Sequence, residues 1–305
     1  MNSTPASVRS PRQIFLIGLG IAITGAILFS SKAIMAKLIY RYSVDAMTLL
    51  AFRMIFSFPF FAVIALWYAR KSAPLSNGDR SRVIFLGVLG YYLSSYLDFI
   101  GLQYMSAGLE RLIMFLTPSF VLLMSVFFLK RKIGAIEWIA LGISYSGTVL
   151  VFVQDVKNGG SNVVLGGMFV LASAILYAVY LLLSGELVRR VGAMRLVAYA
   201  MCVSSVASVA QFLVLRPVSM LMVQPQPVYT LSLINAVFAT VLPVFMTMIA
   251  VDRIGAATTS QAGMIGPVST LFMGALILDE PMTAIQLTGT ALVLSGIYLL
   301  SRKKT

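Results

Sequence analysis

The sequence predicts an all-α membrane protein with ten transmembrane helices, arranged as two inverted repeats of five helices. Three observations predict this architecture. Of the 305 residues, 59% are hydrophobic and only 11% are charged, whereas soluble domains are about half apolar and a quarter charged. Apolar runs of about 20 residues, long enough to cross a hydrocarbon core about 30 Å thick, recur along the whole chain. Finally, the pattern of residues 106–150 occurs again at residues 255–299.

The apolar runs define ten spans, separated by short segments with turn chemistry. The predicted spans are 14–38, 44–68, 83–104, 108–129, 135–153, 163–188, 196–215, 228–251, 256–278 and 283–300. The first run is too long for a cleaved signal peptide, so we interpret it as a retained helix. The predicted organisation is a tail at 1–13, a first repeat at 14–153, a linker at 154–162, a second repeat at 163–301 and a tail at 302–305.

Lysine and arginine are distributed unevenly between the two ends of these spans. Of the 23 basic residues, Lys32 and Arg53 lie within spans. Five lie at the side opposite the termini, and these are Lys37, Arg41, Arg111, Lys157 and Arg216. The other sixteen lie on the side of the termini. Because cytoplasmic segments carry the excess of Lys and Arg, both termini are predicted to be cytoplasmic.

The two copies of the recurring pattern align without a gap. Pro118 aligns with Pro267, and the Ser-Gly pair at 146–147 aligns with the pair at 295–296. The first and sixth spans also match, through Ala-Ile-Leu at 26–28 and again at 174–176. Five spans per repeat is an odd number, so the second repeat enters the membrane from the other side. Inverted repeats of this kind are typical of secondary transporters, with the substrate site between the halves.

These features resemble the paired EamA domains of the drug/metabolite transporter superfamily. The resemblance rests on the repeated hairpin, on Pro118 and Pro267, and on the Leu-Asp-Glu-Pro turn at 278–281. It implies a ten-helix carrier of the bacterial inner membrane, and many such carriers export amino acids or other small metabolites. The chain departs from the family pattern at 130–132, where Lys-Arg-Lys stands in place of the acidic residue that Glu280 supplies in the second half.

Several functional classes have no support in the sequence. With no histidine and with Cys202 as the only cysteine, neither a disulfide framework nor a zinc or copper centre is expected. The net charge of +13 fits the cytoplasmic loops rather than a nucleic-acid partner. No P-loop, HExxH or GxSxG motif is present, so neither an ATPase motor nor a cofactor is expected. The alternatives to a transporter are a membrane-embedded enzyme acting on a lipid-linked substrate, and a non-transporting receptor or scaffold.

Ionisable residues within spans are the main candidates for a substrate site, because they are costly at membrane depth. Asp98 shares one helical face with Tyr91 and Ser95. Lys32 and Arg53 are predicted at a similar depth and are the candidate counter-charges of Asp98. The alternative is a buried polar network that holds helices together. Mixed charge suits a zwitterion such as an amino acid, and a net positive charge suits a carboxylate. Proton coupling through Asp98 or Glu110 is left open.

The second half offers neutral polar side chains instead of charges. These are Tyr177, Tyr180, Thr240, Thr247, Ser260 and Gln261, of which Tyr177, Tyr180 and Gln261 are predicted to contact substrate. Packing between helices is the alternative role of each.

Four residues are candidates for gating. Glu110 and Arg111 begin the fourth span, where one or the other is predicted to pair with the second half as an outer gate when the cavity faces inward. The alternative is that an acid in a first helical turn simply favours the helix dipole. Pro118 and Pro267 are predicted to kink the fourth and ninth spans. Kinks at matched positions suit a rocking carrier, and static shaping of the bundle is the alternative.

Overall fold

The computed structural model describes residues 11–130, 134–159 and 161–302, and these residues form helices joined by short turns. In chain order the helices are α1 (Pro11–Tyr40), α2 (Ala46–Lys71), α3 (Asn77–Leu86), η1 (Gly87–Leu93), α4 (Ser94–Leu102), α5 (Ala107–Met114), α6 (Thr117–Leu129), α7 (Ala135–Gly159), α8 (Ser161–Val191), α9 (Ala193–Leu215), α10 (Ser219–Met222), α11 (Gln226–Ala236), η2 (Val237–Val241), α12 (Leu242–Ala262), α13 (Ile265–Ile277) and α14 (Ala284–Arg302). The two η segments are π-helices.

The prediction of an all-helical membrane protein is confirmed. Within the described ranges, nine helical segments are long and apolar enough to span a membrane, and a shorter apolar helix covers residues 284–300. Together these correspond to the ten predicted spans. The eighth and ninth spans meet inside α12, where Gly255 has a φ of 78°. Glycine adopts this left-handed region without the penalty that a Cβ brings, so the chain turns there between two spans.

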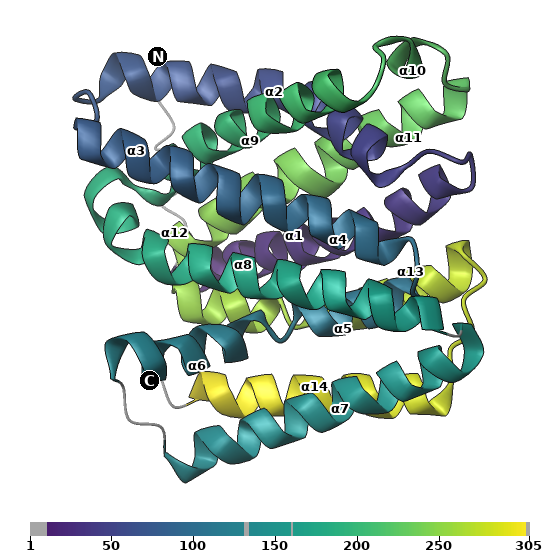
Figure 1. Ribbon diagram of the computed structural model, residues 1–305. Coiled ribbons are helices and arrows are strands. Elements are labelled where there is room, and N and C mark those ends of the chain that lie inside the picture. The colour runs from purple at the N-terminus through teal and green to yellow at the C-terminus, as the bar shows by residue number, and fades with distance from the viewer. Residues whose placement is uncertain (1–10, 131–133, 160, 303–305) are drawn as a thin grey trace, which may run out of the picture.

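The two halves run through the bundle in opposite directions. Helix α1 begins, and α14 ends, at the same end of the molecule (Figure 1), hereafter the terminal face. Helix α8, which begins the second half, starts at the other end, hereafter the opposite face (Figure 1). The residues predicted as a linker, 154–162, are largely helical instead, because α7 continues through Gly159 and α8 begins at Ser161. Of the predicted tails at 1–13 and 302–305, residues 1–10 and 303–305 lie outside the described residues, whereas residues 11–13 belong to α1 and Arg302 to α14.

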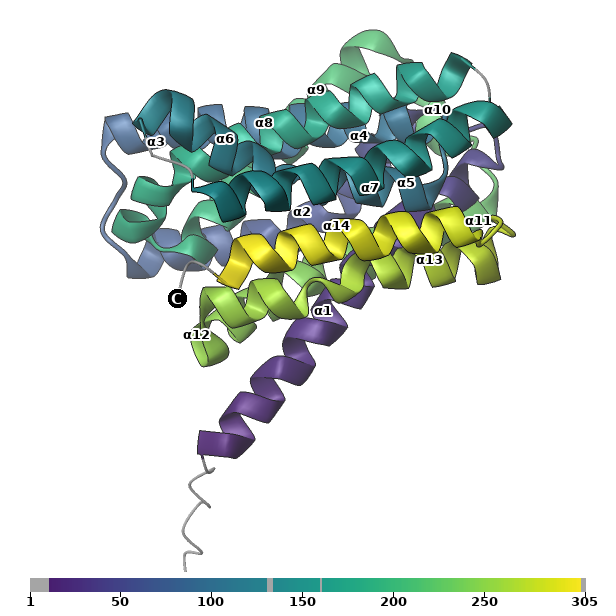
Figure 2. The same ribbon diagram turned by 90° about the horizontal axis from the view of Figure 1, so that it is seen from below.

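The centre of the bundle is the interface between the halves. Helix α1 packs against α12 and α13, and α8 packs in the equivalent way against α4 and α6. Helix α2 packs against α9. Hydroxyl groups cross this interface: Oγ of Ser30 donates to the carbonyl oxygen of Gly266 at 3.0 Å, and Oγ of Ser173 donates to that of Ser94 at 2.8 Å. Figure 2 shows α7 and α14 running side by side and the first turns of α1 projecting beyond the other helices.

The fourth and ninth spans are broken at matched positions. Two turn residues, Phe115 and Leu116, separate α5 from α6, and the turn after Ala262 separates α12 from α13. Pro118 and Pro267 lie in the first turn of the piece that follows each break. A proline is tolerated there because the first backbone N–H groups of a helix have no intrahelical partner. The third and eighth spans likewise each contain a π-helix, η1 and η2. Irregular backbone therefore recurs in both halves near the centre.

Candidate functional site

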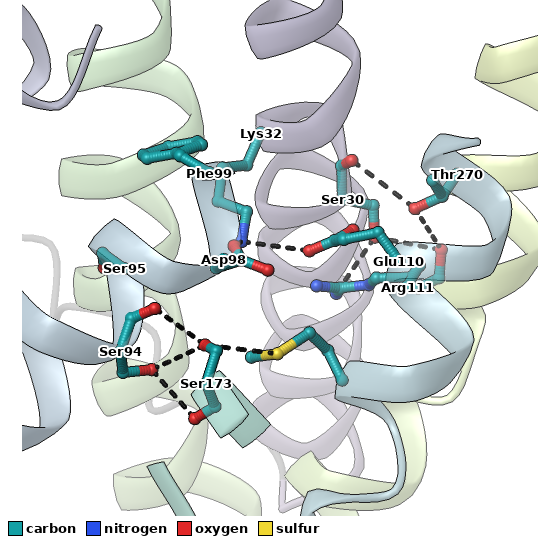
Figure 3. Close-up of polar contacts among 12 residues, drawn as sticks. Ser30, Lys32, Ser94, Ser95, Asp98, Phe99, Glu110, Arg111, Ser173 and Thr270 are labelled. Carbon is teal, nitrogen blue, oxygen red and sulfur yellow. Dashed lines mark hydrogen bonds and ion pairs between the residues drawn. The ribbon is translucent and has the colours of Figure 1, made fainter. Parts of the chain in front are cut away.

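Two carboxylates meet one ammonium group inside the bundle. Lys32 on α1 pairs with Asp98 on α4, and its Nζ lies 3.3 Å from Oε1 of Glu110 on α5. None of the three residues is more than 5% exposed. Figure 3 shows the three side chains converging from three helices of the first half. Because an isolated charge is costly to bury, the shared ion pair lowers the cost of holding these groups at membrane depth.

Two guanidinium groups flank this triad and have only neutral partners among the described residues. Nε of Arg53 on α2 donates to Oγ1 of Thr240 at 2.7 Å, and its Nη1 lies 3.5 Å from Oγ of Ser95. Nη2 of Arg111 on α5 donates to Oγ of Ser30 at 3.2 Å, while its buried Nε has no hydrogen-bond partner. Both arginines are 6% exposed. Neither guanidinium group therefore forms an ion pair within 4.0 Å with a carboxylate of the described residues, although Asp98 and Glu110 lie close enough to act on them electrostatically.

Aromatic rings lie against these two guanidinium groups. Cζ of Arg111 lies 4.9 Å from the ring centre of Phe29 and 5.5 Å from that of Phe115. Cζ of Arg53 lies 5.4 Å from the ring centre of Phe99. The attraction between a cation and an aromatic face offsets part of the cost of burial. A guanidinium group also carries N–H donors whose planar arrangement suits a planar anion.

A cavity of about 210 Å³ lies among these charges, at the interface between the halves. Its charged wall residues are Lys32, Arg53, Asp98 and Arg111. Its other polar wall residues are Tyr91, Ser94, Ser95, Thr117, Ser173, Tyr177 and Thr240. We refer to this space as the charged cavity. Its walls come from both halves, so a relative movement of the halves would change its shape.

A second cavity, of about 370 Å³, adjoins the first on the side of the terminal face. Four serine and threonine side chains line it, and these are Thr117, Thr247, Thr259 and Ser260. We refer to it as the hydroxyl-lined cavity. Both cavities share Arg111, Phe115 and Tyr177 in their walls. The hydroxyl-lined cavity lies beside residues 22–29 of α1, which are closer to the beginning of this helix than Lys32 in the wall of the charged cavity. The two spaces therefore follow each other along the bundle.

Three tyrosines form one wall of the charged cavity and the layer behind it. The rings of Tyr177 and Tyr180 on α8 are stacked, with centres 5.6 Å apart. Tyr91 on η1 meets Tyr180 edge-on at 5.0 Å, and Oη of Tyr180 donates to Oη of Tyr91 at 3.3 Å. A Cβ on Gly90 would lie 2.3 Å from the ring of Tyr180, so only glycine allows this approach. The cluster supplies a large apolar surface beside the charges.

Contacts between helices close the bundle toward the opposite face. The carboxylate of Glu280 accepts the backbone N–H of Ala107 at 3.0 and 3.1 Å, at the beginning of α5. A carboxylate at a helix N-terminus is stabilised by the helix dipole. Burial raises the pKa of Glu280 above its ordinary value, although this N–H group and Lys37 oppose the shift. Oη of Tyr40 donates to the carbonyl oxygen of Phe99 at 2.7 Å, which joins α1 to α4.

The structure brings together most of the residues predicted to bind substrate. Six of them line the charged cavity, and these are Lys32, Arg53, Tyr91, Ser95, Asp98 and Tyr177. Tyr180 is 4% exposed and packs behind Tyr177. Gln261 is exposed and lines neither cavity. Its neighbour Ser260 lines the hydroxyl-lined cavity instead, because consecutive helical residues point about 100° apart.

The four predicted gating residues lie in different surroundings. Arg111 lines both cavities, and Pro118 lines the hydroxyl-lined cavity. Pro267 is buried on α13. The ion pair of Glu110 joins it to Lys32 of its own half, so the predicted pairing with the second half is not present in this conformation. Glu110 and Lys32 lie on α5 and α1, which pack against each other, so Glu110 finds its ionic partner within its own half.

Several wall residues were not predicted from the sequence, including Phe29, Thr117 and Ser173. Phe29 carries no polar signal in an apolar span. Thr117 and Ser173 resemble the many hydroxyl residues that bond only to their own helix. The cap that Glu280 makes on Ala107 was also not predicted. No group of three or more metal-binding side chains occurs among the residues described.

Comparison with known proteins places the chain among membrane transporters. The model of the EamA-like transporter family matches residues 16–153 and again 164–302. Uncharacterized transporter YcbK of Bacillus subtilis is 32% identical over 278 residues, which cover 88% of this chain and 87% of that protein. An uncharacterized transporter of Archaeoglobus fulgidus is 26% identical over 74% of this chain and 79% of its own length. One crystal structure, 16% identical, superposes with a TM-score of 0.65 over 95% of this chain and 99% of that chain, which shows the fold alone.

Proposed function

Because the chain belongs to the EamA-like transporter family, whose members are membrane transporters rather than enzymes, we propose that it is a secondary exporter. Its substrate would be a small polar or amphipathic metabolite, of which an amino acid is an example, moved by alternating access. The observation that carries this proposal is the pair of adjoining cavities between the two halves, next to buried charges. Transporters of inverted-repeat architecture bind substrate at this interface.

The arrangement of contacts supports alternating access. The cap of Glu280 on Ala107 and the bond from Tyr40 to Phe99 close the opposite face. On the other side, the hydroxyl-lined cavity extends from the charges toward the terminal face. Glu280 and Ala107 belong to different halves, so separating the halves at the opposite face would break this cap. The breaks beside Pro118 and Pro267 are the positions at which the fourth and ninth spans bend most easily.

We assign the terminal face to the cytoplasm of a bacterial cell. The assignment rests on the excess of Lys and Arg at that face and on the bacterial relatives. With this orientation the conformation described here faces inward and loads substrate from the cytoplasm, as export requires. A reporter that is active only in the cytoplasm, fused after Thr305, tests it. Fluorescence of a C-terminal green fluorescent protein is expected, and activity of a C-terminal alkaline phosphatase would contradict it.

Transport itself is tested by flux of labelled metabolites into and out of proteoliposomes. The panel contains amino acids, organic acids, amines and sugars of similar size. We expect flux of at least one compound that depends on the protein and saturates. Asp98→Asn should reduce this flux at least about tenfold, because it removes a charge from the ion pair in the cavity wall. Arg216→Gln, at an exposed pair with Asp45, is the control and should retain flux. No flux of any compound, or full flux in folded Asp98→Asn, would contradict the proposal.

A further inference from the structure

We propose that the substrate is an organic monoanion with an apolar body, such as an aromatic or branched-chain monocarboxylate. This inference rests on the proposed transport function and deepens it by choosing among chemical classes. The first argument is the charge of the site. With both carboxylates ionised, Lys32, Arg53 and Arg111 outnumber Asp98 and Glu110, so the buried cluster carries one excess positive charge; a proton on Glu110 would add to this excess. A bound monoanion makes the cluster neutral, a zwitterion leaves the excess unchanged, and a cation doubles it.

The hydrogen-bond and ion-pair partners of the five charged residues also favour an anionic substrate. Both carboxylates already share the ammonium group of Lys32. Both guanidinium groups have only hydroxyl partners, and Nε of Arg111 is buried without one. Guanidinium edges match the two oxygens of a carboxylate and form stronger, charge-assisted hydrogen bonds with it. A carboxylate would therefore supply the ionic partner that Arg53 and Arg111 lack.

The position of the arginines puts them in contact with a molecule in either cavity. Arg53 lines the charged cavity, and Arg111 lines both cavities. An anion in the hydroxyl-lined cavity would meet Arg111 first. Moving toward Arg53 would then take it deeper into the bundle. Transfer between two cationic contacts gives a path along which the negative charge is never left without a partner.

The uncharged residues of the cavity walls indicate what the rest of the substrate is like. Phe29, Phe115 and Tyr177 line both cavities, and Tyr91 and Met201 line the inner one beside the serine and threonine residues named above. Such a surface favours an aromatic ring or a branched aliphatic chain over a sugar. Oδ1 of Asp98 and Oε2 of Glu110 are also buried without a hydrogen-bond partner, and Asp98 lies in the wall of the charged cavity. An ammonium group would have to bind there, in competition with Lys32, so the zwitterion is the alternative that the experiment must separate.

Three ligands with the same ring separate these classes. They are 3-phenylpropionate, phenylalanine and phenethylamine, which are an anion, a zwitterion and a cation. Saturable binding of each radiolabelled compound to the purified full-length protein is measured, with isovalerate as a second anion. We expect an anion to bind at least about tenfold more tightly than phenylalanine, as one charge-assisted pair implies. Tighter binding of phenylalanine or phenethylamine, or no binding of either anion, would overturn the inference.

Variants locate the binding to the two arginines. Arg53→Gln and Arg111→Gln should each weaken anion binding at least about tenfold, while Arg216→Gln stays within about twofold. Each variant is first shown to be folded by its elution profile and its melting temperature. Unchanged affinity in folded Arg53→Gln and Arg111→Gln would overturn the inference. Flux of zwitterions or sugars without any anion binding would overturn it while leaving the proposed transport function intact, whereas no flux of any compound defeats the transport proposal itself.

Discussion

Lys32 on α1 forms an ion pair with Asp98 on α4, and the same ammonium group also contacts Glu110. The three residues do not contribute equally. Lys32→Met leaves two buried carboxylates without their ion pair, which should lower the free energy of unfolding by about 3–5 kcal/mol. Asp98→Asn should lower the free energy of unfolding by less, because Lys32 keeps its ion pair with Glu110. Melting temperatures of the purified variants in detergent test this order, and a larger loss in Asp98→Asn would contradict it.

Thr240 is the neutral partner that orients Arg53 across the interface between the halves. Thr240→Val keeps the shape of the side chain but removes the acceptor, leaving a buried charged donor unpaired. We expect a loss of about 1–3 kcal/mol in stability and weaker substrate binding. Thr240→Ser retains the hydroxyl group and is the matched control. Equal behaviour of the two variants would show that the contact has no role.

Gly147 on α7 and Gly289 on α14 bring the two helices into backbone contact. A Cβ on Gly147 would lie 2.5 Å from the carbonyl oxygen of Gly289. Gly147→Ala should therefore lower stability by about 1–3 kcal/mol through overpacking. A Cβ on Gly142, on the same helix, would meet no neighbouring helix or side chain within 4 Å. Gly142→Ala should be neutral or stabilise by about 0.5–1 kcal/mol, and melting curves of the pair provide the comparison.

Glu280 holds the beginning of α5 at the opposite face. Glu280→Ala removes this cap and should expose the charged cavity to that face more often. A single cysteine, Met114→Cys in a Cys202→Ser background, reports on the cavity because Met114 lines both spaces. A membrane-impermeant maleimide applied to the opposite face should label it several-fold faster in Glu280→Ala. An unchanged rate would mean that the cap does not limit opening.

The same labelling assay should depend on pH through Glu280. Burial raises the pKa of Glu280 in the closed conformation, and Lys37 and Asp155 also face it. If opening exposes the carboxyl group, its pKa returns toward the ordinary value of about 4.3. The closed conformation then binds the proton more tightly, so acid favours closure. Lowering the pH at the opposite face from about 7 to about 5 reduces the thiolate fraction and slows labelling in both proteins, but it should slow labelling more in the parent protein than in Glu280→Gln. A smaller slowing in the parent protein than in Glu280→Gln would reverse the assigned sign.

Much of the architecture follows from the sequence alone. The length of each apolar run determines that it spans as a helix, because a buried backbone in lipid must satisfy its own hydrogen bonds. The repeat, with five spans in each copy, determines that the halves are inverted. The residues that begin α2 are also predictable, since Asp45 accepts a hydrogen bond from the N–H of Thr48 as an N-cap acid does.

The tertiary structure decided which charges meet. From sequence, Lys32 and Arg53 are equivalent counter-charges for Asp98, because a span gives depth but little information on which neighbour lies across a helix interface. In the packed bundle Asp98 and Glu110 both form ion pairs with Lys32. Arg53 and Arg111 form hydrogen bonds with hydroxyl groups instead. Packing also turns Gln261 away from the cavities and brings Ser260 toward one of them. Which side chains meet depends on the rotation of each helix about its axis. Contacts between segments far apart in the sequence determine this rotation, and the hydrophobicity of a span does not.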